Sequence, residues 1–168
     1  MFQTALKSIV AAALLLAVVG CQNQTKTQPA SEAVTVLAQP VPIQACWQGA
    51  ADPALASHQL LLVTSEDQLQ ALGAPSLKDA QVDFDQNDAV LVTMGQQPTG
   101  GYWICVDAIQ KVGDVLYLQG RANAPGEEAV VTLAQTHPYC LVTIPKCADG
   151  DTLTLRSEFT SVAGQDQP

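Results

Sequence analysis

Cysteines are the residues of this sequence best suited to covalent chemistry, and there are five of them. Cys21 follows an apolar N-terminal segment, and Cys46, Cys105, Cys140 and Cys147 are spread over the rest of the chain. An even number of cysteines in an exported domain predicts two disulfides. No pair has the Cys-x-x-Cys spacing of zinc sites and redox motifs, so we expect neither of these at the cysteines.

The spacing of these four cysteines restricts how they can pair. A bridge between Cys140 and Cys147 is unfavourable, because a strand that continues to Ile144 carries the chain ~13 Å away, beyond the Cα separation of a disulfide. Two sets remain: Cys46–Cys140 with Cys105–Cys147, or Cys46–Cys147 with Cys105–Cys140. We favour the first set. Either set would join the early chain to its late strands and add a few kcal/mol of stability.

Catalysis and metal binding have little support in the sequence. The histidines are His58 and His137, and neither belongs to a recognisable catalytic motif. The acidic stretch 83–88 begins like an EF-hand loop, but its sixth position is Asp88 instead of Gly and its twelfth is Met94 instead of Glu. We therefore expect a solvated turn there, and no catalytic residue, metal or cofactor.

The charge of the chain narrows the choice of partners. Its formal net charge is −9 at pH 7. Such a surface repels phosphate backbones and anionic lipid headgroups, and the sequence has no glycine-rich phosphate-binding motif. The composition thus argues against nucleic acid as a partner and favours a protein, in particular a basic one.

The most distinctive stretch joins two apolar runs, residues 89–94 and 102–109, and reads Gly95-Gln96-Gln97-Pro98-Thr99-Gly100-Gly101-Tyr102-Trp103. Proline fixes its own φ and paired glycines can adopt positive φ, so this composition predicts a tight loop between two strands. Neighbouring strand residues point to opposite faces, and we expect the first aromatic ring in the core and the second exposed. A loop on a rigid β framework is a common recognition site. The candidate binding residues are Pro98, Thr99, Gly100, Gly101 and Trp103, with residues 124–128 beside them.

The same loop carries a family resemblance. Pro-Thr-Gly-Gly-Tyr at 98–102, Val-Asp-Phe at 82–84 and His-Pro-Tyr at 137–139, followed by the run 140–145, resemble the PrcB-like C-terminal domain family over roughly residues 58–157. This family takes its name from a subunit of a bacterial cell-surface protease complex. The resemblance implies a β domain that binds or stabilises a protease or another envelope protein.

The loop is also similar to the first inhibitory loop of chagasin-like cysteine-protease inhibitors, which reads Asn-Pro-Thr-Thr-Gly-Tyr. In this chain Gln97 replaces the Asn and Gly100 replaces the second Thr. The sequence has no Arg-Pro-Trp segment like the one that those inhibitors carry in a later loop. This similarity makes a protease inhibitor the alternative function.

The N-terminal segment, residues 1–20, is typical of a lipoprotein signal peptide. Lys7 precedes the apolar run 9–19, which is too short to span a bilayer comfortably. The segment ends Val-Val-Gly before Cys21, which resembles a lipobox and predicts lipidation of that cysteine. Gln22 is not the aspartate known as an inner-membrane retention signal, so we expect an outer-membrane lipoprotein that faces the periplasm. Residues 21–42 would form the lipidated end and a flexible tether.

The remaining chain predicts one mainly β domain, residues 43–160, with a short tail at 161–168. We expect an antiparallel sandwich or open barrel of about seven strands with one short helix. Ser65 and Gln68 mark a capping box for that helix, which would end near Leu72 before Gly73. The expected strands are 58–64, 89–94, 102–109, 115–120, 129–133, 139–144 and 152–156.

Together these features favour a membrane-anchored envelope lipoprotein that acts as a non-catalytic protein-binding module. The partner would be a protease or another envelope protein. A protease inhibitor that inserts the same loop into an active-site cleft is one alternative. A structural envelope lipoprotein, in which the glycine loop only turns the chain, is the other.

Overall fold

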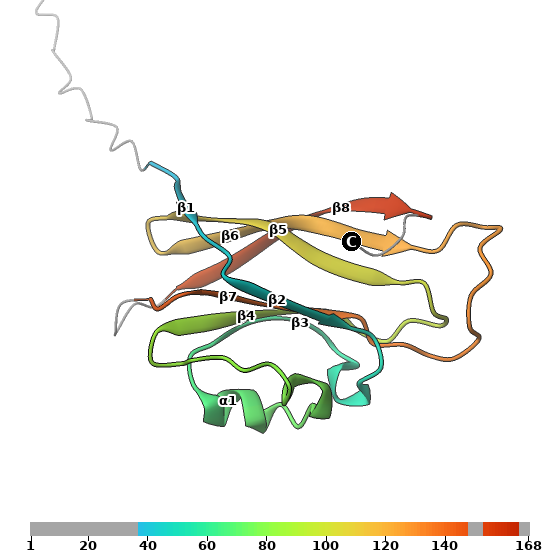
Figure 1. Ribbon diagram of the computed structural model, residues 1–168. Helices are drawn as coiled ribbons and strands as arrows, with labels where there is room; N and C mark the ends of the chain where they lie inside the picture. Colours follow the sequence, from blue (N-terminus) through green and yellow to red (C-terminus); the bar gives the residue numbers. More distant parts are fainter. Residues whose placement is uncertain (1–36, 148–152, 165–168) are drawn as a thin grey trace, which may run out of the picture. The chain divides into compact units, whose positions relative to one another are not determined.

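The computed structural model describes residues 37–147 and 153–164, which form eight strands in two four-stranded sheets (Figure 1). Sheet A has the strand order β1-β5-β6-β8 and sheet B the order β2-β7-β4-β3. All neighbours are antiparallel except β6 and β8, which run parallel. The predicted β sandwich with one short α-helix is confirmed, and the sheets do not close into a barrel. The elements are β1 (Gln39–Val41), β2 (Ala45–Gly49), η1 (Pro53–Leu55), β3 (His58–Val63), α1 (Glu66–Ala71), η2 (Pro75–Leu77), β4 (Asn87–Met94), β5 (Trp103–Val112), β6 (Val115–Ala124), β7 (Tyr139–Pro145) and β8 (Thr154–Ala163).

The membrane-targeting predictions lie outside the described residues. These are the signal segment 1–20, the lipidation site Cys21 and the tether as far as residue 36. Within the part of the chain that the structure describes, no helix is long and apolar enough to cross a bilayer.

The core between the sheets is built by alternate residues of their long strands. Val90 and Val142 of sheet B are fully buried against Ile104 and Leu118 of sheet A. Removing a branched aliphatic side chain from water contributes roughly 1.5–3 kcal/mol, so this layer holds the two sheets together.

The other face of sheet B is covered as well. Figure 1 shows sheet B lying between sheet A and a layer of helical segments. Leu91 and Leu141 of the sheet pack there with leucines of η1, α1 and η2, which are Leu55, Leu69 and Leu77. Burial on two faces explains the continuous apolar run 60–63, in which alternate residues face the helical layer and the opposite sheet.

Helix α1 begins where the sequence predicts. The Ser65 side chain accepts a hydrogen bond from the backbone N–H of Gln68, and the helix ends at the cap residue Leu72. Gln68 Oε1 in turn accepts from the N–H of Thr64 at 2.9 Å, one residue earlier than in a standard capping box. Gly73 then adopts φ +65°, a value that suits glycine at a helix C-terminus.

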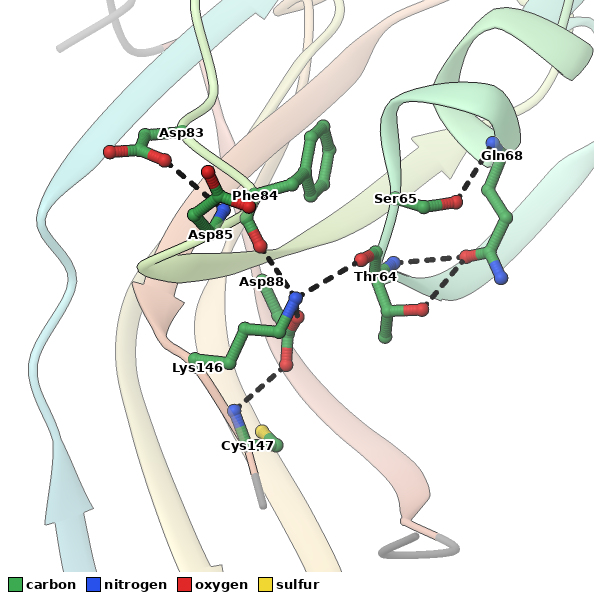
Figure 2. A network of polar contacts seen from close by, with 9 residues as sticks. All are labelled: Thr64, Ser65, Gln68, Asp83, Phe84, Asp85, Asp88, Lys146 and Cys147. Atoms are coloured by element: carbon green, nitrogen blue, oxygen red, sulfur yellow. Dashed lines mark hydrogen bonds and ion pairs between the residues drawn. The ribbon is translucent and has the colours of Figure 1, made fainter. Parts of the chain in front are cut away.

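Lys146 joins three segments at the end of β7 (Figure 2). Its ammonium donates to the carbonyl oxygens of Phe84 and Thr64 and lies 3.7 Å from Asp88 Oδ1. Asp88 is 1% exposed, and its other carboxylate oxygen accepts from the backbone N–H of Cys147 at 2.9 Å. A buried carboxylate is costly unless it is paired, so this contact fixes the start of β4 against the end of β7.

The expected strand at residues 129–133 is wrong. This stretch belongs to an irregular connection between β6 and β7, and Val130 and Leu133 are 103% and 90% exposed. Ala129 N–H closes a turn onto Gly126 O. β-propensity reflects packing on a sheet, and these apolar residues have no sheet to pack against.

The ends of the chain also differ from the expectation. Strand β8 is ten residues long, about twice the predicted 152–156, and it pairs parallel with β6. Strands β1 and β2 were not expected as such. Pro40 lies inside β1, a three-residue strand at the edge of sheet A, which is where a sheet tolerates proline.

Candidate functional site

The loop 95–102 joins β4 to β5 and is fixed at its first residues. Gly95 adopts φ +67°, and a Cβ there would lie 3.1 Å from Ala56 O and His58 N. The next residue, Gln96, donates its N–H to Ala56 O at 2.9 Å. The loop therefore starts by turning tightly over the segment that leads into β3.

A second loop, residues 125–138, lies beside the first at the same end of the sandwich (Figure 1). Gln97 and Thr136 exchange two backbone hydrogen bonds of 2.7 and 3.0 Å in an isolated antiparallel bridge. The Thr136 hydroxyl donates to Thr99 O at 2.8 Å, and Gly100 N–H donates to Thr132 O at 2.9 Å. These four hydrogen bonds make the two loops one structural unit, which we call the two-loop surface (residues 95–102 and 125–138).

The two glycines of the loop are required for different reasons. Gly101 adopts φ +85°, and a Cβ there would lie 3.0 Å from both Pro125 Cβ and Val131 Cγ1. Gly100 is not in a positive-φ conformation, but a Cβ would come within 2.5 Å of Thr132 Oγ1. Gly101 is thus required for its positive φ, and Gly100 is required for the close approach of the two loops. The expected neighbourhood of residues 124–128 is confirmed by Pro125.

The two-loop surface exposes several apolar side chains. Val130 and Leu133 are almost fully exposed, Pro98 is exposed and Tyr102 is half-buried. Exposed Glu127 and Glu128 precede Val130 and Leu133 in the chain. Exposed aliphatic residues on loops that are held by backbone hydrogen bonds are typical of protein interaction sites.

The sequence prediction for the aromatic pair is inverted. Trp103 is 5% exposed and lies in β5 beside Asn123 of β6, so it is not the exposed ring that we expected. The guanidinium of Arg121 lies 5.8 Å from the centre of its ring. Tyr102 is half-buried and keeps part of its surface exposed to solvent. Trp103 shares the outer face of sheet A with Arg121 and Asn123 of β6, so a ring that points away from the core between the sheets is still buried.

Arg121 is held over Trp103 by an ion pair. Its Nε and Nη2 donate to the two carboxylate oxygens of Asp107 at 2.9 and 2.8 Å. These hydrogen bonds outweigh burial and lower the pKa of Asp107, so the carboxylate stays charged at neutral pH. The bidentate pair also covers Cys105, which is 3% exposed.

Asn123 connects the loop to sheet A. Its side chain is 2% exposed, and its amide donates to Gly101 O at 2.8 Å. Sequence reasoning overlooked this residue and also Thr132, Thr136, Val130 and Leu133. Of these residues, only Val130 and Leu133 could have been found from the sequence. They follow Pro-Gly-Glu-Glu at 125–128, a composition typical of a loop, although the apolar stretch 129–133 also fits a strand.

Beneath the second loop, Asp52 organises the helical layer. It is 4% exposed and accepts from Ala54 N–H and from both the N–H and the hydroxyl of Ser76 at 2.8–3.0 Å. Burial raises the pKa of this carboxyl, but the donors of Ser76 and Ala54 prevail and lower it overall. His137, two residues before β7, forms an isolated parallel β-bridge with Ala51, the neighbour of Asp52 in the chain. His137 therefore serves the framework of the loop.

The cysteines fall into one contacting pair and two separated residues. Cys46 Sγ and Cys140 Sγ lie 3.7 Å apart on β2 and β7, at contact distance and not bonded. The predicted partners Cys105 and Cys147 lie on opposite faces of sheet A. Cys105 is opposite Arg121 on the outer face, whereas Cys147 packs against the core between the sheets. The structure therefore contradicts the Cys105–Cys147 bridge, and a Cys46–Cys140 bridge stays a prediction.

These features define a β-sandwich domain that presents two joined loops at one end. In comparisons with known proteins, residues 89–145 match the family described as PrcB C-terminal. The matched segment runs from β4 to β7 and contains the entire two-loop surface. The family resemblance seen in the sequence is thus confirmed, whereas similarity to chagasin-like inhibitors is not shown. Neither the curated proteins nor the solved structures gave a match.

Proposed function

We propose that this protein is a lipid-anchored module of the bacterial envelope that binds another protein through the two-loop surface. The observation that carries the proposal is the exposure of Val130 and Leu133 on loops that are fixed to each other by backbone hydrogen bonds. Ordered loops lose little conformational entropy on binding, so their exposed aliphatic groups contribute more of their burial energy to affinity.

The family match suggests what the partner is. The resemblance noted in the sequence implies a protease-associated partner, and the segment that matches the family contains both loops. We propose a protease or another envelope protein as the partner, with the module binding or stabilising it without taking part in chemistry. The acidic pair Glu127 and Glu128 beside the aliphatic residues favours a contact surface that carries lysine or arginine at its rim.

The lipobox-like sequence before Cys21 supports the anchor. A lipidated Cys21 followed by a polar tether would keep the module at the outer membrane on the periplasmic side, where an envelope protease is accessible. Membrane attachment would also raise the effective concentration of the module near a partner in the same membrane.

The test is affinity capture from envelope extracts with matched variants. Val130→Ser and Leu133→Ser together should abolish capture while the melting temperature stays unchanged, because both side chains are already exposed. Leu37→Ser is the control, since Leu37 is also exposed (74%) but precedes β1. Unchanged capture by the double variant, or equal loss with the control, would refute the two-loop surface as the binding site.

A captured protease allows the alternative functions to be separated. A binding or stabilising module should preserve or prolong the activity of the protease, whereas an inhibitor should reduce it in proportion to occupancy. A structural lipoprotein should capture no partner that depends on Val130 and Leu133.

A further inference from the structure

Strand β8 is the longest edge of the two sheets. It forms the last strand of sheet A, and among the described residues no strand pairs with its outer side (Figure 1). Its ten residues contain no proline, whereas the opposite edge, β1, has three residues, one of them Pro40. A long edge strand offers a row of backbone donors and acceptors to another strand.

The side chains of β8 alternate between two environments. Leu155, Ser157 and Phe159 share the face of their β6 partners Leu116, Leu118 and Gly120, which is the face toward sheet B. Leu155 and Phe159 pack against that core but are only half-buried, because no further strand covers them. Arg156 and Glu158 point to the opposite face and are exposed.

We propose that β8 pairs antiparallel with β8 of a second copy of this chain, with the twofold axis at Ser157. In this register Arg156 lies opposite Glu158 of the second copy, and the symmetry repeats the pair on the other side. Leu155 likewise lies opposite Phe159 of the second copy on the core face. Two attractive charge pairs and two apolar pairs then form at once, as cross-strand pairing requires.

The neighbouring registers are unfavourable. Residues that lie opposite each other in an antiparallel pair point to the same face of the sheet, so their positions differ by an even number. A twofold axis perpendicular to the sheet must therefore pass through a residue and not between two residues. An axis at Arg156 would place two guanidinium groups opposite each other, and an axis at Glu158 would do the same with two carboxylates. Only Ser157, small and exposed, allows the opposite charges to meet. Arg156 and Glu158 thus disfavour pairing of β8 with most other strands, whereas they are complementary to Glu158 and Arg156 of a second copy.

This arrangement would merge two A sheets into one continuous eight-stranded sheet. The two loops follow β4 and β6, and Gly126 approaches Gly164 just after β8, beyond residues 155–159 that the pairing uses. The inference is therefore independent of the proposed function, and failure of either does not affect the other.

The test is cysteine cross-linking of the full-length protein in its membrane. Ser157→Cys places two thiols on the twofold axis, and copper–phenanthroline oxidises them to one disulfide by removing two electrons and two protons. The matched control is Ser161→Cys on the same strand and face. Its two thiols would be separated by about 27 Å along the strands, given ~3.4 Å per residue. A dimer of twice the mass should form with Ser157→Cys and not with Ser161→Cys.

Charge reversal supplies the second measurement. Arg156→Glu in the Ser157→Cys background should lower the yield of cross-linked dimer about tenfold, because two like-charge pairs replace two attractive ones. Adding Glu158→Arg exchanges the charges and should restore the yield. Equal cross-linking at 157 and 161, no cross-linking at 157, or failure of the exchanged variant to recover would overturn the proposal. So would capture of another protein by Ser157→Cys in place of its own copy.

Discussion

Gly100 and Thr132 approach so closely that a Cβ on the glycine would lie 2.5 Å from Thr132 Oγ1. Gly100 N–H also donates to Thr132 O, so the contact both joins the two loops and sets their spacing. The spacing matters for the proposed binding, because the exposed Val130 and Leu133 belong to the loop that Gly100 holds.

Gly100→Ala should therefore displace the second loop and weaken partner capture. We expect a loss of about 1–2 kcal/mol of stability from the forced contact. Thr132→Ala removes the clashing hydroxyl, and the nearest remaining atom on that side chain is 3.6 Å from the new Cβ. The double variant should recover most of the stability and of the capture. Thermal melting with affinity capture checks this, and additive losses in the double variant would contradict it.

Trp103→Ala should be far more damaging than Tyr102→Ala. Trp103 is 5% exposed, and truncation of a buried aromatic ring costs roughly 3–5 kcal/mol. Tyr102 is half-buried, so its truncation should cost less stability and act more on partner capture. Urea unfolding of both variants measures the difference. The original face assignment would be reinstated if Tyr102→Ala were the more destabilised variant.

Asp52 predicts a specific pH dependence of stability. Its pKa is lower in the folded protein than in the unfolded chain, so its contribution is complete above the unfolded value of about 4. The contribution is lost as the pH falls through the folded pKa. Asp52→Asn should lower stability at pH 7 by about 1–3 kcal/mol and reduce the further loss between pH 7 and pH 2.

Urea unfolding across that pH range checks the Asp52 prediction. Asp79→Asn, on the exposed segment after η2, serves as the control. If Asp52→Asn and the wild type lose equal stability on acidification, Asp52 is not the group responsible.

If the protein is exported as we propose, the Cys46–Cys140 contact predicts a disulfide. Mass spectrometry of unreduced, denatured protein should find peptides that link Cys46 with Cys140, and none that link Cys105 with Cys147. The bridge closes a large loop and should add roughly 3–5 kcal/mol. Detection of unlinked Cys46 and Cys140 in protein isolated without reductant would refute it.

Reduction should expose a difference in reactivity between the thiols. The Cys140 thiol donates to Cys46 and lowers the pKa of Cys46 to about 6, despite the opposing effect of burial. Burial raises the pKa of Cys105. Iodoacetamide at pH 7 should therefore modify Cys46 first, and its rate should fall as the pH drops below 6. Faster labelling of Cys105 would contradict this order.

Cys21→Ser tests the membrane anchor. The variant should incorporate no fatty acid and should leave the membrane fraction or stay unprocessed, because the lipid acceptor is absent. Metabolic fatty-acid labelling followed by fractionation measures both. Equal labelling of the variant and the wild type would exclude Cys21 as the lipidation site.

Local sequence signals determined much of the fold by themselves. Ser65 and Gln68 marked the start of α1, and the continuous run 60–63 indicated a strand that is buried on both faces. The Pro-Thr-Gly-Gly stretch predicted the loop before β5, because proline and glycine restrict and permit backbone angles whatever surrounds them. The PrcB resemblance was also readable from these motifs.

Tertiary structure decided which side chains the surface presents. Trp103 and Val130 have similar apolar character in the sequence, yet one is buried and the other fully exposed. Trp103 is covered on the outer face of sheet A by Arg121 from the neighbouring strand, whereas Val130 lies on a loop that Thr132 and Thr136 join to residues 97–100. Such contacts have no local sequence pattern, because they arise from packing between segments that are far apart in the chain. The same reason hid the separation of Cys105 from Cys147, since the face of a strand residue relative to distant segments is set only when the two sheets pack.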